Sequence, residues 1–213
     1  MSRVPPTNDN AIAAIRRFTE RQLGDFGEAI WSRVLAFSGF HCVSLTKICE
    51  GGAPLARNSG GNLILPDFDA YRDGRSVFVE SKAKTRSIVY SNKKQERHGI
   101  DERNYLHYQE IERQSGKPCC IGIVELWRED VARKDFLYWS GSLLFEKLSD
   151  LIDPRSEHPE VPAKVYWRRK QFRDLHGGLS PVELFEIAVG KRQLSLRWEL
   201  ENILNPAHQA SLF

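Results

Sequence analysis

Apolar residues recur at helical spacing over the first forty positions of the chain. This period predicts a helix over 11–22, an interruption at Gly24, and a second helix over 25–37 that ends before Gly39. The apolar stripe of the second helix consists of Phe26, Ile30, Val34 and Phe37. We therefore expect two helices at the start of the fold.

Glu28 is an acidic residue inside the second of these helices. At about 100° per residue it lies on the side of Trp31 and Leu35, next to the apolar stripe and not opposite to it. We therefore expect a partly buried carboxylate at this position.

Short apolar runs bounded by turn residues follow the two helices. They predict a strand over 41–46, a glycine-bearing loop, and a strand over 62–70. The dipeptide Asp73-Gly74 is typical of a hairpin turn, and a returning strand is expected over 76–83. Two antiparallel strands should therefore form a hairpin around this turn.

The rest of the chain alternates between helical and strand periods. We expect helices over 101–114, 143–151 and 181–190, and strands over 119–126, 136–140 and 163–167. Ser180 and Glu183 form a capping box at the start of the last of these helices. The order of elements predicts an α/β fold with a mixed central sheet flanked by helices and a C-terminal α+β extension. The expected parts are an N-terminal segment with a helix over 1–19, a core over 20–140, and an extension of unknown role over 141–213.

Composition narrows the class of protein. Apolar residues make up 41% of the 213 positions, which is ordinary for a globular domain and excludes disorder as the main state. We find neither a signal peptide nor an apolar run long enough to cross a membrane, so a cytoplasmic protein without a membrane partner is expected. The cysteines lack the spacing of a zinc site and are interpreted as reduced thiols: Cys42, Cys49, Cys119 and Cys120.

Candidate chemistry lies on the predicted hairpin. Residues two apart on a strand share a face, so Glu80 and Lys82 project together while Val77, Val79 and Ser81 face the other way. Asp67 comes on the preceding strand, and antiparallel pairing brings it next to Glu80.

Two carboxylates and a lysine in this arrangement suit hydrolysis of a phosphodiester. Mg²⁺ binds through one or two protein carboxylates and completes its shell with water and substrate phosphate. Asp67 and Glu80 would supply that pair, and the carbonyl of Ser81 is a third candidate ligand. Lys82 would orient or deprotonate the attacking water and offset charge on the phosphate.

The motif Pro66-Asp67, twelve residues, then Glu80-Ser81-Lys82 resembles the signature of the PD-(D/E)XK nuclease superfamily. Upstream, Gly27-Glu28 in a helix followed by a strand is similar to the opening of resolvase-like members. Downstream, a helix and a strand follow as in phage-type members, with the residues His98-Gly99-Ile100, Tyr105 and Tyr108. The resemblance covers about 20–127.

This resemblance implies a restriction-endonuclease-like fold and assigns roles to single residues. Asp67 and Glu80 would bind a divalent cation, Mg²⁺ with Mn²⁺ as a substitute, and Lys82 would assist the water or the transition state. Glu28 would complete or support the metal site. Tyr105 and Tyr108 share one helix face and are interpreted as packing residues, with contact to the substrate as the alternative. Asp69 is interpreted as structural, with a role as a substitute or additional acid as the alternative.

Cationic residues gather beside the expected site. Between 82 and 98 six of them stand against one acid, in a chain whose net charge is only +3. Such a concentration suits the phosphate backbone of a nucleic acid, with solvation of a loop as the alternative. The candidate contacts are Lys84, Arg86, Lys93, Lys94, Arg97, His98 and, in the glycine loop, Arg57; a structural role is the alternative for His98.

The sequence therefore predicts a Mg²⁺-dependent deoxyribonuclease. Two alternatives remain open: an inactive nuclease-like module that binds nucleic acid or protein, and a nuclease acting on RNA or branched junctions. The sequence leaves open whether cleavage is internal or from an end, whether the DNA is duplex or single-stranded, and whether the chain forms a homodimer.

Overall fold

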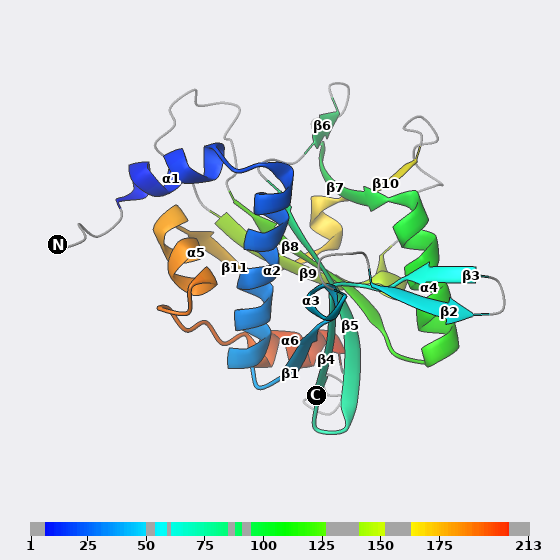
Figure 1. Ribbon diagram of the computed structural model, residues 1–213. Helices are drawn as coiled ribbons and strands as arrows, with labels where there is room; N and C mark the ends of the chain where they lie inside the picture. The colour runs from blue at the N-terminus through cyan, green and yellow to red at the C-terminus, as the bar shows by residue number, and fades with distance from the viewer. Residues whose placement is uncertain are drawn as a thin grey trace, which may run out of the picture.

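The computed structural model describes residues 7–49, 54–58, 61–84, 88–90, 95–126, 141–151 and 163–204. Its centre is a six-stranded sheet in the order β1-β4-β5-β8-β9-β11 (Figure 1). These strands are β1 (His41–Ser44), β4 (Phe68–Arg72), β5 (Arg75–Lys84), β8 (Cys119–Glu125), β9 (Gly141–Lys147) and β11 (Arg173–Leu179). Strands β5 and β8 pair in parallel and all other neighbours in the sheet pair antiparallel, so the sheet is mixed.

Helices flank this sheet, which confirms the predicted α/β class. They are α1 (Asn8–Arg16), α2 (Glu20–Phe37), α3 (Leu45–Ile48), α4 (Glu102–Ser115), α5 (Pro181–Ala188) and α6 (Arg197–Leu204). Short 3-10 turns follow β9 and β10, namely η1 (Leu148–Asp150) and η3 (Arg169–Gln171). None of the described helices is both long and apolar enough to cross a membrane.

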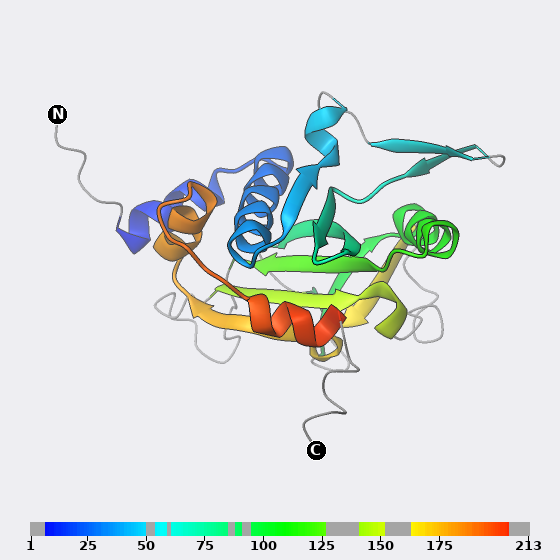
Figure 2. The ribbon, with the colours of Figure 1, turned by 90° about the horizontal axis from the view of Figure 1, so that it is seen from below.

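Two smaller sheets complete the described fold. One has three strands in the order β10 (Lys164–Arg168), β7 (Gln95–Asp101) and β6 (Ile88–Tyr90), and the other is a hairpin of β2 (Leu55–Asn58) and β3 (Gly61–Ile64). In Figure 2 this hairpin extends away from the body of the molecule.

The two faces of the central sheet belong to different cores. Val77 and Val79 of β5 pack with Trp31 of α2, in a core that also includes Leu184 of α5. Phe78, between them in sequence, packs on the other face in a core that includes Tyr108 of α4. The alternation along β5 therefore separates an apolar back face from the face that carries Glu80 and Lys82.

The structure bears out several of the local predictions. The β4–β5 hairpin turns at Asp73 and Gly74, whose φ angles of 50° and 76° are those that a tight primed turn requires. Helix α4, strand β8, strand β10 and helix α5 also lie where the sequence predicts them. The predicted strand 136–140 lies outside the described residues.

Two helix predictions were wrong. The first helix break is not at Gly24 but before Glu20, because Thr19 forms a capping box with Gln22 and starts α2 there. The stretch 143–151 is not a helix: β9 covers most of it and ends in η1. Buried on both faces, β9 has a continuous apolar run that its period alone does not distinguish from a helix.

Candidate functional site

A cavity of 740 Å³ is lined by residues of the central sheet, of α2, of α4 and of the base of the β2–β3 hairpin. Its lining includes Asp67, Glu80 and Lys82 from the sheet, Glu28 from α2, Tyr108 from α4, and Ile64 from the hairpin. The residues that the sequence analysis placed in one site therefore share one cavity.

Asp67 is fixed by the start of β4. The β4–β5 register pairs Phe68 with Val79, and continuing it places Asp67 opposite Glu80. The backbone N–H of Ser81 donates to Asp67 Oδ2 over 2.8 Å, and the N–H of Leu45 donates to the Asp67 carbonyl over 2.8 Å. These two hydrogen bonds hold Asp67 beside β5, one at its side-chain carboxylate and the other at its backbone carbonyl.

Glu80 is 2% exposed and has a partner on each oxygen. Lys82 Nζ forms an ion pair with Oε1, as expected for residues two apart on one strand face. The hydroxyl of Tyr108 donates to Oε2 over 2.6 Å.

The site holds more acid than its cations offset. Burial, followed by the nearby charge of Glu80, raises the pKa of Asp67 to about 8. Burial lowers the pKa of Lys82, but the carboxylates of Glu80 and Asp67 outweigh burial, so the pKa is raised and the amine keeps its proton. Burial also raises the pKa of Tyr108, and the Glu80 charge adds to this, so its hydroxyl remains a donor.

Glu28 lies on the α2 wall of the same cavity and is half-buried, as its helical position predicts. Thr46 donates its hydroxyl hydrogen to Glu28 Oε2 over 2.9 Å. Burial raises the pKa of Glu28, against the opposing effect of the Thr46 hydrogen bond. Glu28 is therefore turned toward α3 in this structure, although Glu80 and Asp67 are near enough to interact with its charge.

The donor set fits a hard divalent cation of the Mg²⁺ type. Within the described residues no three His, Cys, Asp or Glu side chains converge as a ready ligand cluster. Mg²⁺ does not need one, because one or two carboxylates with water and substrate oxygens suffice. Asp67 and Glu80 supply these carboxylates, and a cation there would oppose the burial and the Glu80 charge that raise the pKa of Asp67. The carbonyl of Ser81 as a third ligand stays a prediction.

The structure describes only some of the predicted nucleic-acid contacts. Lys84 follows Lys82 on the same face of β5, where burial and then the charge of Lys82 lower its pKa. Arg57 lies on β2 opposite Asn62, but its side chain is outside the described residues. Outside them as well are Arg86, Lys93 and Lys94.

Arg97 and His98 correct the sequence analysis. Both are in β7 and only 2% exposed, so neither presents its charge to a polyanion at the surface. The cationic stretch continues into a strand that pairs with β10 and packs on the central sheet, and this burial favours the structural alternative for His98.

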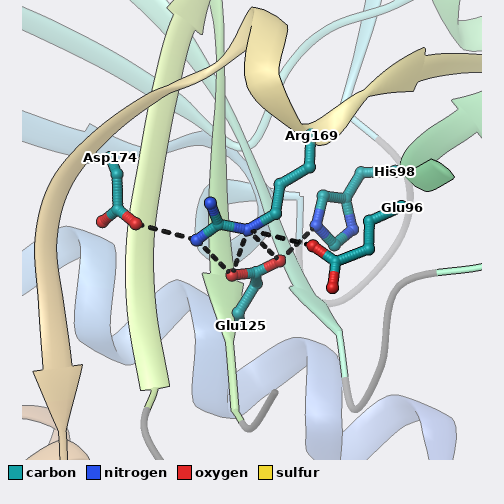
Figure 3. A network of polar contacts seen from close by, with 5 residues as sticks. All are labelled: Glu96, His98, Glu125, Arg169 and Asp174. Atoms are coloured by element: carbon teal, nitrogen blue, oxygen red, sulfur yellow. Dashed lines mark hydrogen bonds and ion pairs between the residues drawn. The ribbon is translucent and has the colours of Figure 1, made fainter. Parts of the chain in front are cut away.

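His98 belongs to a network of charged side chains that connects β7, β8, η3 and β11 (Figure 3). Its Nε2 lies 2.6 Å from Glu125 Oε1, and Arg169 lies against the same carboxylate at 2.8 Å. Arg169 also contacts Asp174 at 2.8 Å and Glu96 at 3.9 Å. Burial raises the pKa of Glu125, but the bonds from His98 and Arg169 outweigh burial, so its pKa is lowered.

Sequence reasoning missed two contacts of the site. Tyr108 was assigned to packing, and it also binds Glu80. Its placement three residues after Tyr105 on one helix face was a signal that both point at the sheet, but not that one reaches a carboxylate. Thr46 was read as the end of a strand; its contact with Glu28 spans 18 positions and has no local signature.

No family model and no curated protein matches the chain. Among solved structures the fold is similar to a Holliday junction resolvase from the archaeal hyperthermophile Archaeoglobus fulgidus. The sequence identity is 9%, the match covers 65% of this chain and 82% of that one, and the TM-score is 0.38. Likeness at this level does not define a family or an activity.

Proposed function

We propose that this chain is a metal-dependent deoxyribonuclease that hydrolyses phosphodiester bonds in the cavity between α2 and α4. The observation that carries the proposal is the convergence of Asp67, Glu80 and Lys82 on one cavity, where burial and then the Glu80 charge raise the pKa of Asp67. A carboxyl group whose pKa is strongly raised inside a cavity is a candidate for a binding or reactive role.

In the proposed reaction water attacks a phosphodiester in line while the P–O bond to the leaving 3′-oxygen breaks, and no covalent enzyme intermediate forms. A bound Mg²⁺ or Mn²⁺ would activate the water and stabilise charge on the phosphate oxygens. Asp67 and Glu80 hold the cation, and Glu28 supports it from the α2 wall.

Lys82 acts as a cation in this proposal and not as a base. Its amine is protonated next to Glu80 and Asp67, so it can donate to a phosphate oxygen or orient the water, but it has no free pair to accept a proton. In this proposal Lys82 therefore orients the water and stabilises charge on the phosphate.

Cations on the cavity wall suit a polyanionic substrate. Arg21 of α2 and Lys47 of α3 line the cavity opposite α4, and Lys84 continues the β5 row beyond Lys82. Contacts of this kind position a nucleic-acid backbone without reading its bases.

The test is cleavage of plasmid, single-stranded DNA, branched DNA and RNA with Mg²⁺, comparing the parent with Asp67→Asn and Glu80→Gln. Both substitutions keep side-chain size and should reduce cleavage at least about 100-fold. Asp69→Asn is the matched control: Asp69 is two residues from Asp67, pairs with Lys117, and is not among the cavity-lining residues.

Equal cleavage by the parent and both site variants would refute the assignment of the ligands. A parent that cleaves none of the four substrates but still binds DNA would favour the inactive binding module. Preference within the panel would decide between DNA and RNA.

A further inference from the structure

Tyr108 is a buried polar group whose hydroxyl reaches the candidate site. It is 1% exposed and lies within the core that α4 forms against the sheet. Its hydroxyl donates to Glu80 Oε2 over 2.6 Å, a short distance typical of a hydroxyl bound to a carboxylate.

The surroundings hold the Tyr108 ring in one direction. It is part of the same apolar cluster as Ile111 of its own helix and Ile121 of the neighbouring strand β8. The Cys119 thiol of β8 donates to the backbone carbonyl of Tyr108 over 3.4 Å. The hydroxyl is thus carried by a helix that is fixed to the sheet, and the ring has little room to turn away from Glu80.

The two partners of Glu80 differ in their freedom. The side chain of Lys82 is 31% exposed, and its long flexible stem can move the amine toward a substrate. Tyr108 has no such freedom. When Lys82 leaves Oε1 free for a cation or turns to a phosphate, the hydrogen bond from Tyr108 to Oε2 can persist and keep the carboxylate in place.

We propose that Tyr108 is a positioning residue that aims the Glu80 carboxylate at the cavity and so sets the affinity of the site for a divalent cation. This inference rests on the proposed function, because it takes Glu80 as a ligand. Carboxylate ligands of metals are commonly oriented by hydrogen bonds from a surrounding layer of residues, and loss of such a bond weakens metal binding about 10–100-fold.

The test compares Tyr108→Phe with Tyr105→Phe. Each removes one hydroxyl from a buried tyrosine on the same face of α4, and Tyr105 is 3% exposed. The Tyr105 hydroxyl accepts a hydrogen bond from Gln109, and its ring packs against Trp167. The pair therefore separates the bond to Glu80 from the general effect of losing a buried hydroxyl.

Binding of Mn²⁺ to the metal-free protein is measured by calorimetry, with thermal unfolding and cleavage on the same samples. We expect Tyr108→Phe to weaken Mn²⁺ binding about 10-fold or more and Tyr105→Phe to leave it unchanged. Cleavage by Tyr108→Phe should fall at low Mn²⁺ and recover as Mn²⁺ is raised, with little change in KM for DNA.

Three outcomes would overturn the inference. If the parent binds Mn²⁺ and Tyr108→Phe binds it equally well, Tyr108 is structural and the proposed function still stands. If both tyrosine variants lose affinity in proportion to lost thermal stability, the effect is again structural. If the parent neither binds Mn²⁺ nor cleaves DNA, the proposed function fails and this inference fails with it.

Discussion

Two groups of charged side chains lie on the same face of the central sheet, on neighbouring strands. Glu80 and Lys82 lie on β5, and Glu125 lies on β8 opposite Lys84. At Glu125 the His98 ring and the Arg169 guanidinium bind the carboxylate, and its pKa is lowered. At the cavity, burial and neighbouring acids raise the pKa of Asp67 to about 8.

The comparison of Asp67 with Glu125 shows which of the two acids contributes to the stability of the fold. The Glu125 network pairs its charges within the protein and connects four elements (Figure 3). At the cavity, the charge of Glu80 adds to burial in raising the pKa of Asp67, and no group among the described residues reverses this increase. A divalent cation bound there would therefore stabilise the carboxylate.

Removing Arg169 should have the largest effect on stability. Arg169→Ala leaves Glu125 with His98 alone in a buried setting, and we expect a loss of about 3 kcal/mol in the free energy of unfolding. Urea unfolding measures it. A loss below about 1 kcal/mol would mean that the network is not a source of stability.

Adding a divalent cation should raise the free energy of unfolding through the candidate site, and the Glu125 network should not be needed for this increase. At a hundred times the dissociation constant, a ligand that binds only the folded state adds about 2.7 kcal/mol. Thermal unfolding with and without Mn²⁺ should show this increment in the parent and in Arg169→Ala, but not in Asp67→Asn. An equal shift in Asp67→Asn would place the cation elsewhere.

The two regions should respond to pH in opposite directions. Between 3.8, the ordinary pKa of Asp67, and about 8, its folded-state pKa, the folded protein keeps a proton that the unfolded chain has released. Stability from this group therefore falls as pH rises through that window. For Glu125 the pKa is lowered from 4.5, so its stabilisation is present above that pH and is lost as pH falls through the lowered value.

Asp67→Asn isolates the first of these effects. In the absence of metal it should raise the free energy of unfolding by roughly 2 kcal/mol at neutral pH and remove the decline toward pH 8. Urea unfolding at several pH values measures both. A variant as pH-dependent as the parent would show that Asp67 is not the group responsible.

Asp69→Asn should have the smallest effect. Asp69 accepts from Lys117 over 2.8 Å, and both side chains are about one-third exposed, so solvent weakens the pair. We expect less than about 1 kcal/mol of lost stability, measured by urea unfolding, and unchanged Mn²⁺ binding. A cation-binding defect in this variant would extend the site along β4.

The candidate site was predictable where its geometry is local. Asp67, Glu80 and Lys82 belong to one hairpin, and a turn dipeptide with a period of two residues determines which side chains meet. The α/β class followed in the same way from the alternation of periods.

The rest depends on contacts between distant segments. His98 meets Glu125 across 27 positions and Arg169 meets it across 44, so no local pattern marks His98 or Arg97 as buried. The sequence predicts a helix for strand β9, because a strand that is buried on both faces has a continuous apolar run. Its pairing with β8 in the sheet identifies it as a strand. Tyr108 was placed on the correct helix face, but its bond to Glu80 depends on how α4 sits against β5.

The close approach of α2 to β5 has a consequence for mutational tolerance. A Cβ at Gly27 would lie 2.9 Å from the Cβ of Ala83, so a larger residue would push the helix away from the strand. Ala83 directly follows Lys82, and the acids project from the opposite side of that strand. In a saturation library scored for activity, we therefore expect few substitutions to be tolerated at Gly27. This position has no reactive atom, but it sets the distance between α2 and β5 on the face opposite the acids.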